Sequence, residues 1–140
     1  MGSSGSKNDR LALLAPPTMP CTSQAPLFNG LLYRLTDERD GTIGFFNNSK
    51  DYEFQISYLF TSDSMIEPLD KTAVMEQDDG ILCEVVVYPL ESQRFVRGSV
   101  VGFESKIEAV PLSEEYFRLH KDLNGKKYFR RLGPFPSQSF

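Results

Sequence analysis

Apolar and polar residues alternate with a period of two along the middle of the chain. In the stretch DYEFQISYLF, Tyr52, Phe54, Ile56 and Tyr58 are separated by polar side chains. This period is typical of a β-strand that buries one face and exposes the other. We therefore predict a strand over these residues, with its aromatic and aliphatic face in a core.

Short apolar runs of the same kind continue from residue 27 to residue 112, with turn signals between them. Further strands are expected at 31–36, 42–47, 72–77, 81–88, 95–101 and 106–110. Asp40-Gly41 and Asp78-Asp79-Gly80 mark tight turns, in which glycine supplies a positive φ angle. The helices that a βαβ arrangement needs are missing from this pattern. The predicted fold class is all-β, a compact antiparallel β-sandwich or barrel-like domain with one short C-terminal helix.

The predicted helix follows Pro111. Ser113 can cap the first amide donors, and Glu114 and Glu115 lie where the helix dipole favours negative charge. Asn124-Gly125 is expected to end the helix.

Two segments of different composition flank the β-domain. Residues 1–26 hold four prolines among serine and threonine, which disfavours both helix and sheet, and are predicted to form a flexible arm. Residues 27–117 are predicted to form the antiparallel β-domain. Residues 118–140 are predicted to form a basic, aromatic tail.

Charge is divided unevenly among these three parts. The whole chain of 140 residues has a formal net charge of −4, to which residues 1–26 contribute +1, residues 27–117 contribute −10 and residues 118–140 contribute +5. An acidic body repels the phosphates of nucleic acid, so nucleic acid is not an expected partner. An anionic partner should instead meet the tail.

The apolar runs and the cysteines of the sequence indicate the cellular compartment of the protein. No apolar run approaches the ~20 residues that span a bilayer, and residues 11–15 are too short for the apolar region of a signal peptide. Cys21 and Cys83 fit a reducing compartment in which neither is paired. We therefore expect a protein that is not secreted.

The sequence offers no convincing catalytic centre. His120 is the single histidine, and we expect a solvated side chain there rather than a general base. Cys83 shares a strand face with aliphatic residues, which favours a buried thiol over a nucleophile, and Cys21 is expected to be an inert exposed thiol. One histidine and two distant cysteines lack the spacing of a zinc site. The prediction is a protein that is not an enzyme and holds no metal or cofactor.

Two acidic turns could in principle offer oxygen ligands to calcium. Asp37, Glu38 and Asp40 surround one turn, and Asp78 and Asp79 occupy another. Carboxylates on loops can bind calcium, but aspartate beside glycine is also ordinary turn chemistry, and we favour the plain turn.

Both ends of the chain carry candidate membrane contacts. Gly2 follows the initiator methionine and is followed by Ser6 and Lys7, which fits the acceptor pattern for N-myristoylation; a polar linker of the kind that precedes purification tags is the alternative. The tail interleaves basic and aromatic side chains, as membrane-surface segments do. The candidate contacts are Lys126, Lys127, Tyr128, Phe129, Arg130 and Arg131. Stacking on single-stranded nucleic acid and docking of the aromatics on the body are alternatives.

Four stretches of the chain resemble a known family. LFNGLLYRL, NNSKDYEF, VVVYPLES and GFESKIEAVPLSEEY, spread over about residues 27–117, are similar to the small β-domain of the kinetoplastid calpain-like proteins, in particular the small myristoylated protein type. The resemblance implies a compact β-domain without protease activity, acylated at Gly2. Ser3 stands where those proteins carry a cysteine, so a second, palmitoylated anchor is not expected.

The resemblance and the residues together predict a function. The chain is expected to be a non-catalytic, N-myristoylated adaptor or structural protein of the flagellar or subpellicular membrane skeleton. Its partners would be the inner leaflet of a membrane, bound through myristate and the basic tail, and a cytoskeletal or flagellar protein. The alternative is a soluble β-sandwich module that binds a hydrophobic ligand, calcium and phospholipid, or a cytoskeletal protein.

Overall fold

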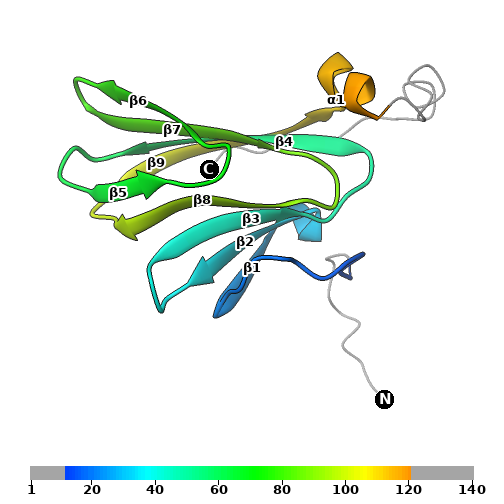
Figure 1. The fold of residues 1–140 in the computed structure, drawn as a ribbon, viewed down its shortest axis with the longest axis horizontal. Coiled ribbons are helices and arrows are strands. Elements are labelled where there is room, and N and C mark those ends of the chain that lie inside the picture. Colours follow the sequence, from blue (N-terminus) through cyan, green and yellow to red (C-terminus); the bar gives the residue numbers. More distant parts are fainter. Residues whose placement is uncertain (1–11, 121–140) are drawn as a thin grey trace.

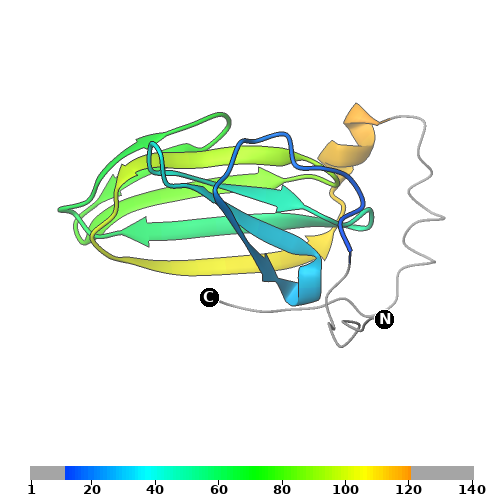
Figure 2. The same cartoon turned by 90° about the horizontal axis from the view of Figure 1, so that it is seen from below.

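A computed structural model describes residues 12–120, which form two antiparallel sheets packed face to face (Figures 1 and 2). The five-stranded sheet has the order β1-β2-β3-β8-β5 and the four-stranded sheet the order β6-β7-β4-β9. The first contains β1 (Ser23–Leu27), β2 (Leu32–Asp37), β3 (Thr42–Asn47), β8 (Ser92–Ser99) and β5 (Met65–Pro68), and the second contains β6 (Ala73–Gln77), β7 (Gly80–Val87), β4 (Tyr52–Phe60) and β9 (Phe103–Pro111). The predicted all-β sandwich is confirmed.

The core between the sheets is aromatic. Phe95 of β8 lies at its centre, with ring centroids 5.1 Å from Tyr58, 5.6 Å from Phe45 and 6.3 Å from Phe60. All four side chains are almost completely buried. Tyr58 and Phe60 belong to the apolar face of β4, so the alternation in the sequence identified the buried face correctly.

Residues 12–26 correct the prediction of a flexible arm. Ser23–Leu27 form strand β1, which pairs with β2 from Ser23↔Thr36 to Leu27↔Leu32. β1 is the edge strand of its sheet, where Pro26 can be accommodated although it lacks an N–H group. The proline content therefore excluded a central strand but not an edge strand.

The residues before β1 cover the outer face of the five-stranded sheet. Met19 is buried there, in a second, smaller core with Tyr33, Leu35 and Phe46. Gly44 of β3 has no side chain, and the Met19 sulfur occupies the space that a Cβ atom would take. The ordered domain therefore begins well before residue 27.

A short 3₁₀ turn and one α-helix complete the described chain. The turn, η2 (Phe28–Gly30), joins β1 to β2. The helix, α1 (Glu114–Leu119), begins where predicted, because the Ser113 hydroxyl accepts a hydrogen bond from the N–H of Tyr116 at 3.3 Å. It ends at Leu119, earlier than expected; the predicted end at Asn124-Gly125 lies outside the described residues. No helix within residues 12–120 is long and apolar enough to cross a bilayer.

The predicted turns are confirmed, and two strand boundaries differ. Gly41 has a φ of 74° in the turn between β2 and β3, and Gly80 has a φ of 155° where β7 begins. β8 and β9 both begin before their predicted starts at residues 95 and 106. β5 was not predicted, because its four residues are mostly exposed and show no alternation.

Candidate functional site

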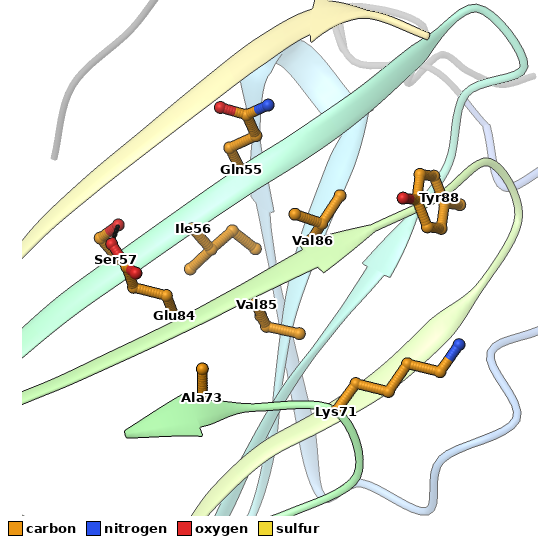
Figure 3. Close-up of a pocket in the computed structure, with 9 residues that line it drawn as sticks. All are labelled: Gln55, Ile56, Ser57, Lys71, Ala73, Glu84, Val85, Val86 and Tyr88. Atoms are coloured by element: carbon orange, nitrogen blue, oxygen red, sulfur yellow. Dashed lines mark hydrogen bonds between the residues drawn. The ribbon is translucent and has the colours of Figure 1, made fainter. Parts of the chain in front are cut away.

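A groove of about 410 Å³ lies on the outer face of the four-stranded sheet (Figure 3). The groove forms a notch at the edge of the sheet, where the edge strand β6 ends before its neighbour β7 does. β6 pairs with β7 only over residues 80–84, so residues 85–87 of β7 have no ladder neighbour on that side in the described part of the chain. The chain leaves this edge at Thr72, whose hydroxyl donates a hydrogen bond to the carbonyl of Phe95 in the other sheet at 2.8 Å.

The lining of the groove combines an apolar floor with separated charges. Val86 lies between Glu84 and Tyr88 on the outer face of β7 (Figure 3). Glu84 accepts a hydrogen bond of 3.1 Å from the hydroxyl of Ser57 in β4, and Lys71 stands on the opposite wall. This arrangement suits binding of an extended segment, with apolar contact in the middle and polar contact at both ends.

Tyr88 connects the groove to the C-terminal helix. Its ring lies 5.4 Å from that of Tyr116 in α1. Burial raises the pKa of the Tyr88 phenol, and the negative charge of Glu53 adds to this effect. The phenol is therefore neutral at physiological pH and acts as a hydrogen-bonding group, not as a base.

Cys83 and His120 are not brought together. Cys83 lies in the core between the sheets, and burial raises the pKa of its thiol to about 11. His120 follows α1 and is exposed, with its ring stacked on Tyr116 at 4.2 Å and Nδ1 3.0 Å from the Tyr116 carbonyl oxygen. The prediction of a buried thiol is confirmed. Because the thiol is protonated and distant from the histidine, this pair cannot supply a thiolate nucleophile.

Cys21 is half-buried, whereas an exposed thiol was predicted. It packs against the small core around Met19, and the amide nitrogen of Gln24 lies 3.7 Å from its sulfur. Cys21 is less exposed than predicted because residues 12–22 lie against the outer face of the five-stranded sheet.

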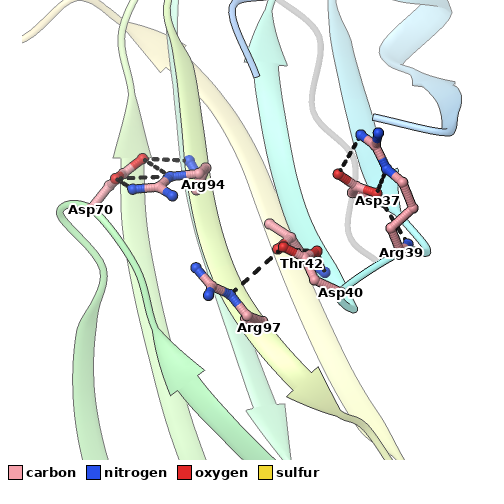
Figure 4. A network of polar contacts seen from close by, with 7 residues as sticks. All are labelled: Asp37, Arg39, Asp40, Thr42, Asp70, Arg94 and Arg97. Atoms are coloured by element: carbon pink, nitrogen blue, oxygen red, sulfur yellow. Dashed lines mark hydrogen bonds and ion pairs between the residues drawn. The ribbon is translucent and has the colours of Figure 1, made fainter. Parts of the chain in front are cut away.

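The acidic turn between β2 and β3 is occupied by the chain's own donors (Figure 4). Asp37 forms a bidentate pair with Arg39, at 2.8 and 2.9 Å, and this contact holds the pKa of its carboxyl below the usual value. Asp40 accepts a hydrogen bond of 2.7 Å from the hydroxyl of Thr42. These contacts fit the interpretation as a plain turn.

A second ion pair links the connection between β5 and β6 to strand β8, two parts of the chain for which the sequence predicted no contact. Arg94 of β8 donates to Asp70 at 2.9 Å and lowers the pKa of that carboxyl (Figure 4).

The second acidic turn, Asp78 and Asp79, lies between β6 and β7. Within residues 12–120, no group of three or more His, Cys, Asp or Glu side chains is placed to hold a metal ion.

Some site residues were predicted and others were not. Gly2 and the six basic and aromatic tail residues lie outside the described residues, so their roles stay predictions. The groove was missed. The polar half of the alternation in β4 placed Ser57 on the outer face, but the notch depends on where β6 stops pairing, for which the sequence has no signal.

The chain matches one protein family and two solved structures. The family model described as "Domain of unknown function (DUF1935)" matches residues 13–112. The start of that match agrees with the ordered segment before β1. No curated protein matches the chain.

Two solved structures from Leishmania major are similar to this one. The NMR structure of SMP-1, a small myristoylated protein, is 34% identical, with a TM-score of 0.74 over 86% of this chain and 94% of that chain. A hypothetical protein is 36% identical, with a TM-score of 0.69 over 76% of this chain and 97% of that chain. The chain belongs to the family that is defined by the domain of unknown function DUF1935.

Proposed function

We propose that this protein is a non-catalytic, N-myristoylated adaptor or structural protein that associates with the cytoplasmic face of a membrane. The similarity to SMP-1, which is named for its myristoylation and is covered over 94% of its length, carries the proposal. The acceptor pattern at Gly2 agrees with it. A calpain-like, non-peptidase ancestry and a flagellar or subpellicular location are the finer parts of the same proposal.

The chemistry of the described residues supports a binding role. The Cys83 thiol is buried and protonated, and in the acidic turn Asp37 is paired with Arg39 while Asp40 accepts a hydrogen bond from Thr42. The groove offers contact surface without a nucleophile and base in reach of one another. The family and the two similar structures carry no enzymatic name.

Membrane binding would need two contributions. A myristoyl chain alone partitions with a constant of order 10⁴ M⁻¹, or about 5–6 kcal/mol, which gives reversible attachment. Each basic residue of the tail adds up to about 1 kcal/mol at an anionic surface, less the screening by salt. The proposed attachment is therefore sensitive to ionic strength.

Metabolic labelling tests the anchor. Cells that express the protein are fed a myristate analogue that carries a chemical handle, and labelled protein is detected after capture. We expect the wild type to be labelled and a Gly2→Ala variant to be unlabelled, because the acyl chain is attached to the glycine amine. Ser3→Ala is the matched control and should keep the label. Label on Gly2→Ala would contradict the proposal.

The groove is the proposed partner site of the adaptor. Val86→Lys places a charge on its apolar floor, and we expect the fraction of protein retained in the detergent-insoluble membrane skeleton to fall several-fold. Val74→Lys is the matched control, because Val74 is an exposed valine of the same sheet outside the groove. Equal retention of both variants would exclude the groove, and labelling of Gly2 would be unaffected in either case.

A further inference from the structure

Three exposed apolar side chains lie at one end of the sandwich, where β4 connects to β5 and β8 connects to β9 (Figure 1, left). Met65 begins β5 and is 77% exposed, Val101 lies in the loop between β8 and β9 and is 64% exposed, and Phe103 begins β9 and is 45% exposed. We call these three residues the Phe103 patch. Single exposed apolar residues are ordinary, but a group of them on adjoining loops is typical of an interaction site.

Hydrogen bonds between the two loops hold the Phe103 patch in place. The N–H of Thr61 donates to the carbonyl of Gly102 at 2.9 Å. The N–H of Val101 donates to the hydroxyl of Ser64, the residue before Met65, at 3.0 Å. Because the loops are joined to each other, the patch is ordered before a partner arrives, and binding need not order it.

A hollow of about 370 Å³ opens beside Phe103. The Phe103 ring stacks on the Tyr58 ring of the core at 4.9 Å, which fixes it as one wall of the hollow. The other walls combine apolar and acidic side chains: Leu59, Thr61, Asp79 and Glu104. The hollow therefore suits an apolar side chain of a partner that carries positive charge beside it.

The surroundings of the Phe103 patch are acidic. The loops at 61–64, 78–79 and 100–102, together with the start of β9, carry four exposed acids and no lysine or arginine: Asp63, Asp78, Asp79 and Glu104. Two cations on the neighbouring strands are directed to other carboxylates. Lys106 Nζ lies 3.5 Å from Glu108, and Arg97 Nε lies 4.0 Å from Asp40. The four acids are therefore available to a cationic partner.

Charge decides between the possible occupants of the Phe103 patch. An anionic bilayer or a nucleic acid would bring further negative charge to four carboxylates. A second copy related by a two-fold axis would place this acidic end against itself. A basic protein segment brings the opposite charge, and an arginine can lie over an exposed aromatic ring while it pairs with a carboxylate.

We propose that the Phe103 patch is a docking site for a basic segment of a partner protein. An aliphatic or aromatic side chain of the segment enters the hollow beside Phe103, and its lysine or arginine residues pair with the four acids. The site shares no lining residue with the groove and does not depend on the lipid anchor. Because these charge pairs are exposed, salt weakens the binding.

Selection from a phage-displayed library of short random peptides tests the site. Wild-type full-length protein is the target, and the double variant Met65→Ser with Val101→Ser is used for counter-selection. We expect the enriched peptides to carry several lysine or arginine residues beside an aliphatic or aromatic one. Raising the salt concentration from about 0.05 to about 0.5 M should weaken their binding several-fold.

The affinity of one enriched peptide, synthesised with a fluorophore, is then measured by anisotropy. The dissociation constant is expected to rise about tenfold in Met65→Ser with Val101→Ser, and several-fold in Asp79→Asn with Glu104→Gln. All four positions are exposed, so both variants should keep the fold. The matched control replaces two exposed leucines outside the patch, Leu13→Ser with Leu119→Ser, and should leave the constant unchanged.

The absence of enrichment, the enrichment of neutral or acidic peptides, or equal affinity of the patch variant and the leucine control overturns the proposal. Two other occupants are tested directly. If replacing the four basic residues of segment 126–131 with alanine shifts the amide NMR signals of residues 101–103 in the free chain, the chain's own tail occupies the patch. If Met65→Ser with Val101→Ser abolishes binding to phosphatidylserine vesicles, the patch contacts lipid. Either result overturns the proposal, whereas an unlabelled Gly2 leaves it intact.

Discussion

Replacing Phe95 with alanine is expected to lower the free energy of unfolding by about 3–5 kcal/mol. Phe95 has no exposed surface, and its ring touches the rings of Tyr58, Phe45 and Phe60 from both sheets. Truncation removes its own burial and leaves a cavity at the point where the two layers meet. The surrounding aromatic side chains are fixed by their strands and cannot collapse into that space.

Chemical denaturation of the wild type and the variant, followed by tyrosine fluorescence and circular dichroism, measures this difference. Phe103→Ala is the matched control. Phe103 stacks on the Tyr58 ring at 4.9 Å but is 45% exposed, so its truncation should cost clearly less, about 1–2 kcal/mol. Equal losses for the two variants would show that Phe95 is not the centre of the core.

The sequence predicts the interior of this fold better than its margins. Residues buried on one face alternate with polar ones, so β4 and the apolar face of β7 could be identified without the structure. β1 could not, because its stability comes from pairing with β2 at a sheet edge, where the usual objection to Pro26 does not apply. Met19 was missed for a related reason: it packs on the outer face of a sheet, and it fits there because Gly44 lies beneath it.

The candidate site shows the same division between local and long-range information. The apolar setting of Cys83 was visible in its neighbours along the strand, whereas the groove arises from the mismatch between a five-residue β6 and an eight-residue β7. The contact of Arg94 with Asp70 joins residues 24 positions apart, and no local pattern marks it.

The Asn48→Ala variant is expected to be less stable than the wild type by about 2–4 kcal/mol. Asn48 is fully buried, and its side chain satisfies three backbone groups: its Nδ2 donates to the carbonyls of Ala12 at 3.0 Å and Gly30 at 2.8 Å, and its Oδ1 accepts from the N–H of Leu14 at 2.7 Å. Alanine leaves these groups without partners, and the Gly30 bond is in the interior. The loss is large because the cost falls on groups that water reaches poorly.

The same side chain joins the N-terminal segment to the domain, so its removal should also have a local effect. Hydrogen exchange at the Leu14 amide is expected to become fast in Asn48→Ala, beyond the change at amides of β4 that report global unfolding. Ser92→Ala is the matched control: it removes one bond, from the N–H of Thr18 at 3.0 Å, at an exposed position, and should cost less than about 1 kcal/mol. If Leu14 exchanged equally slowly in all three proteins, Asn48 would not be what holds this segment. Fast exchange at the Leu14 amide in an otherwise intact sandwich would instead show that the Asn48 side chain holds the start of the ordered segment to the domain, and so fixes the point from which the chain continues toward the proposed lipid anchor.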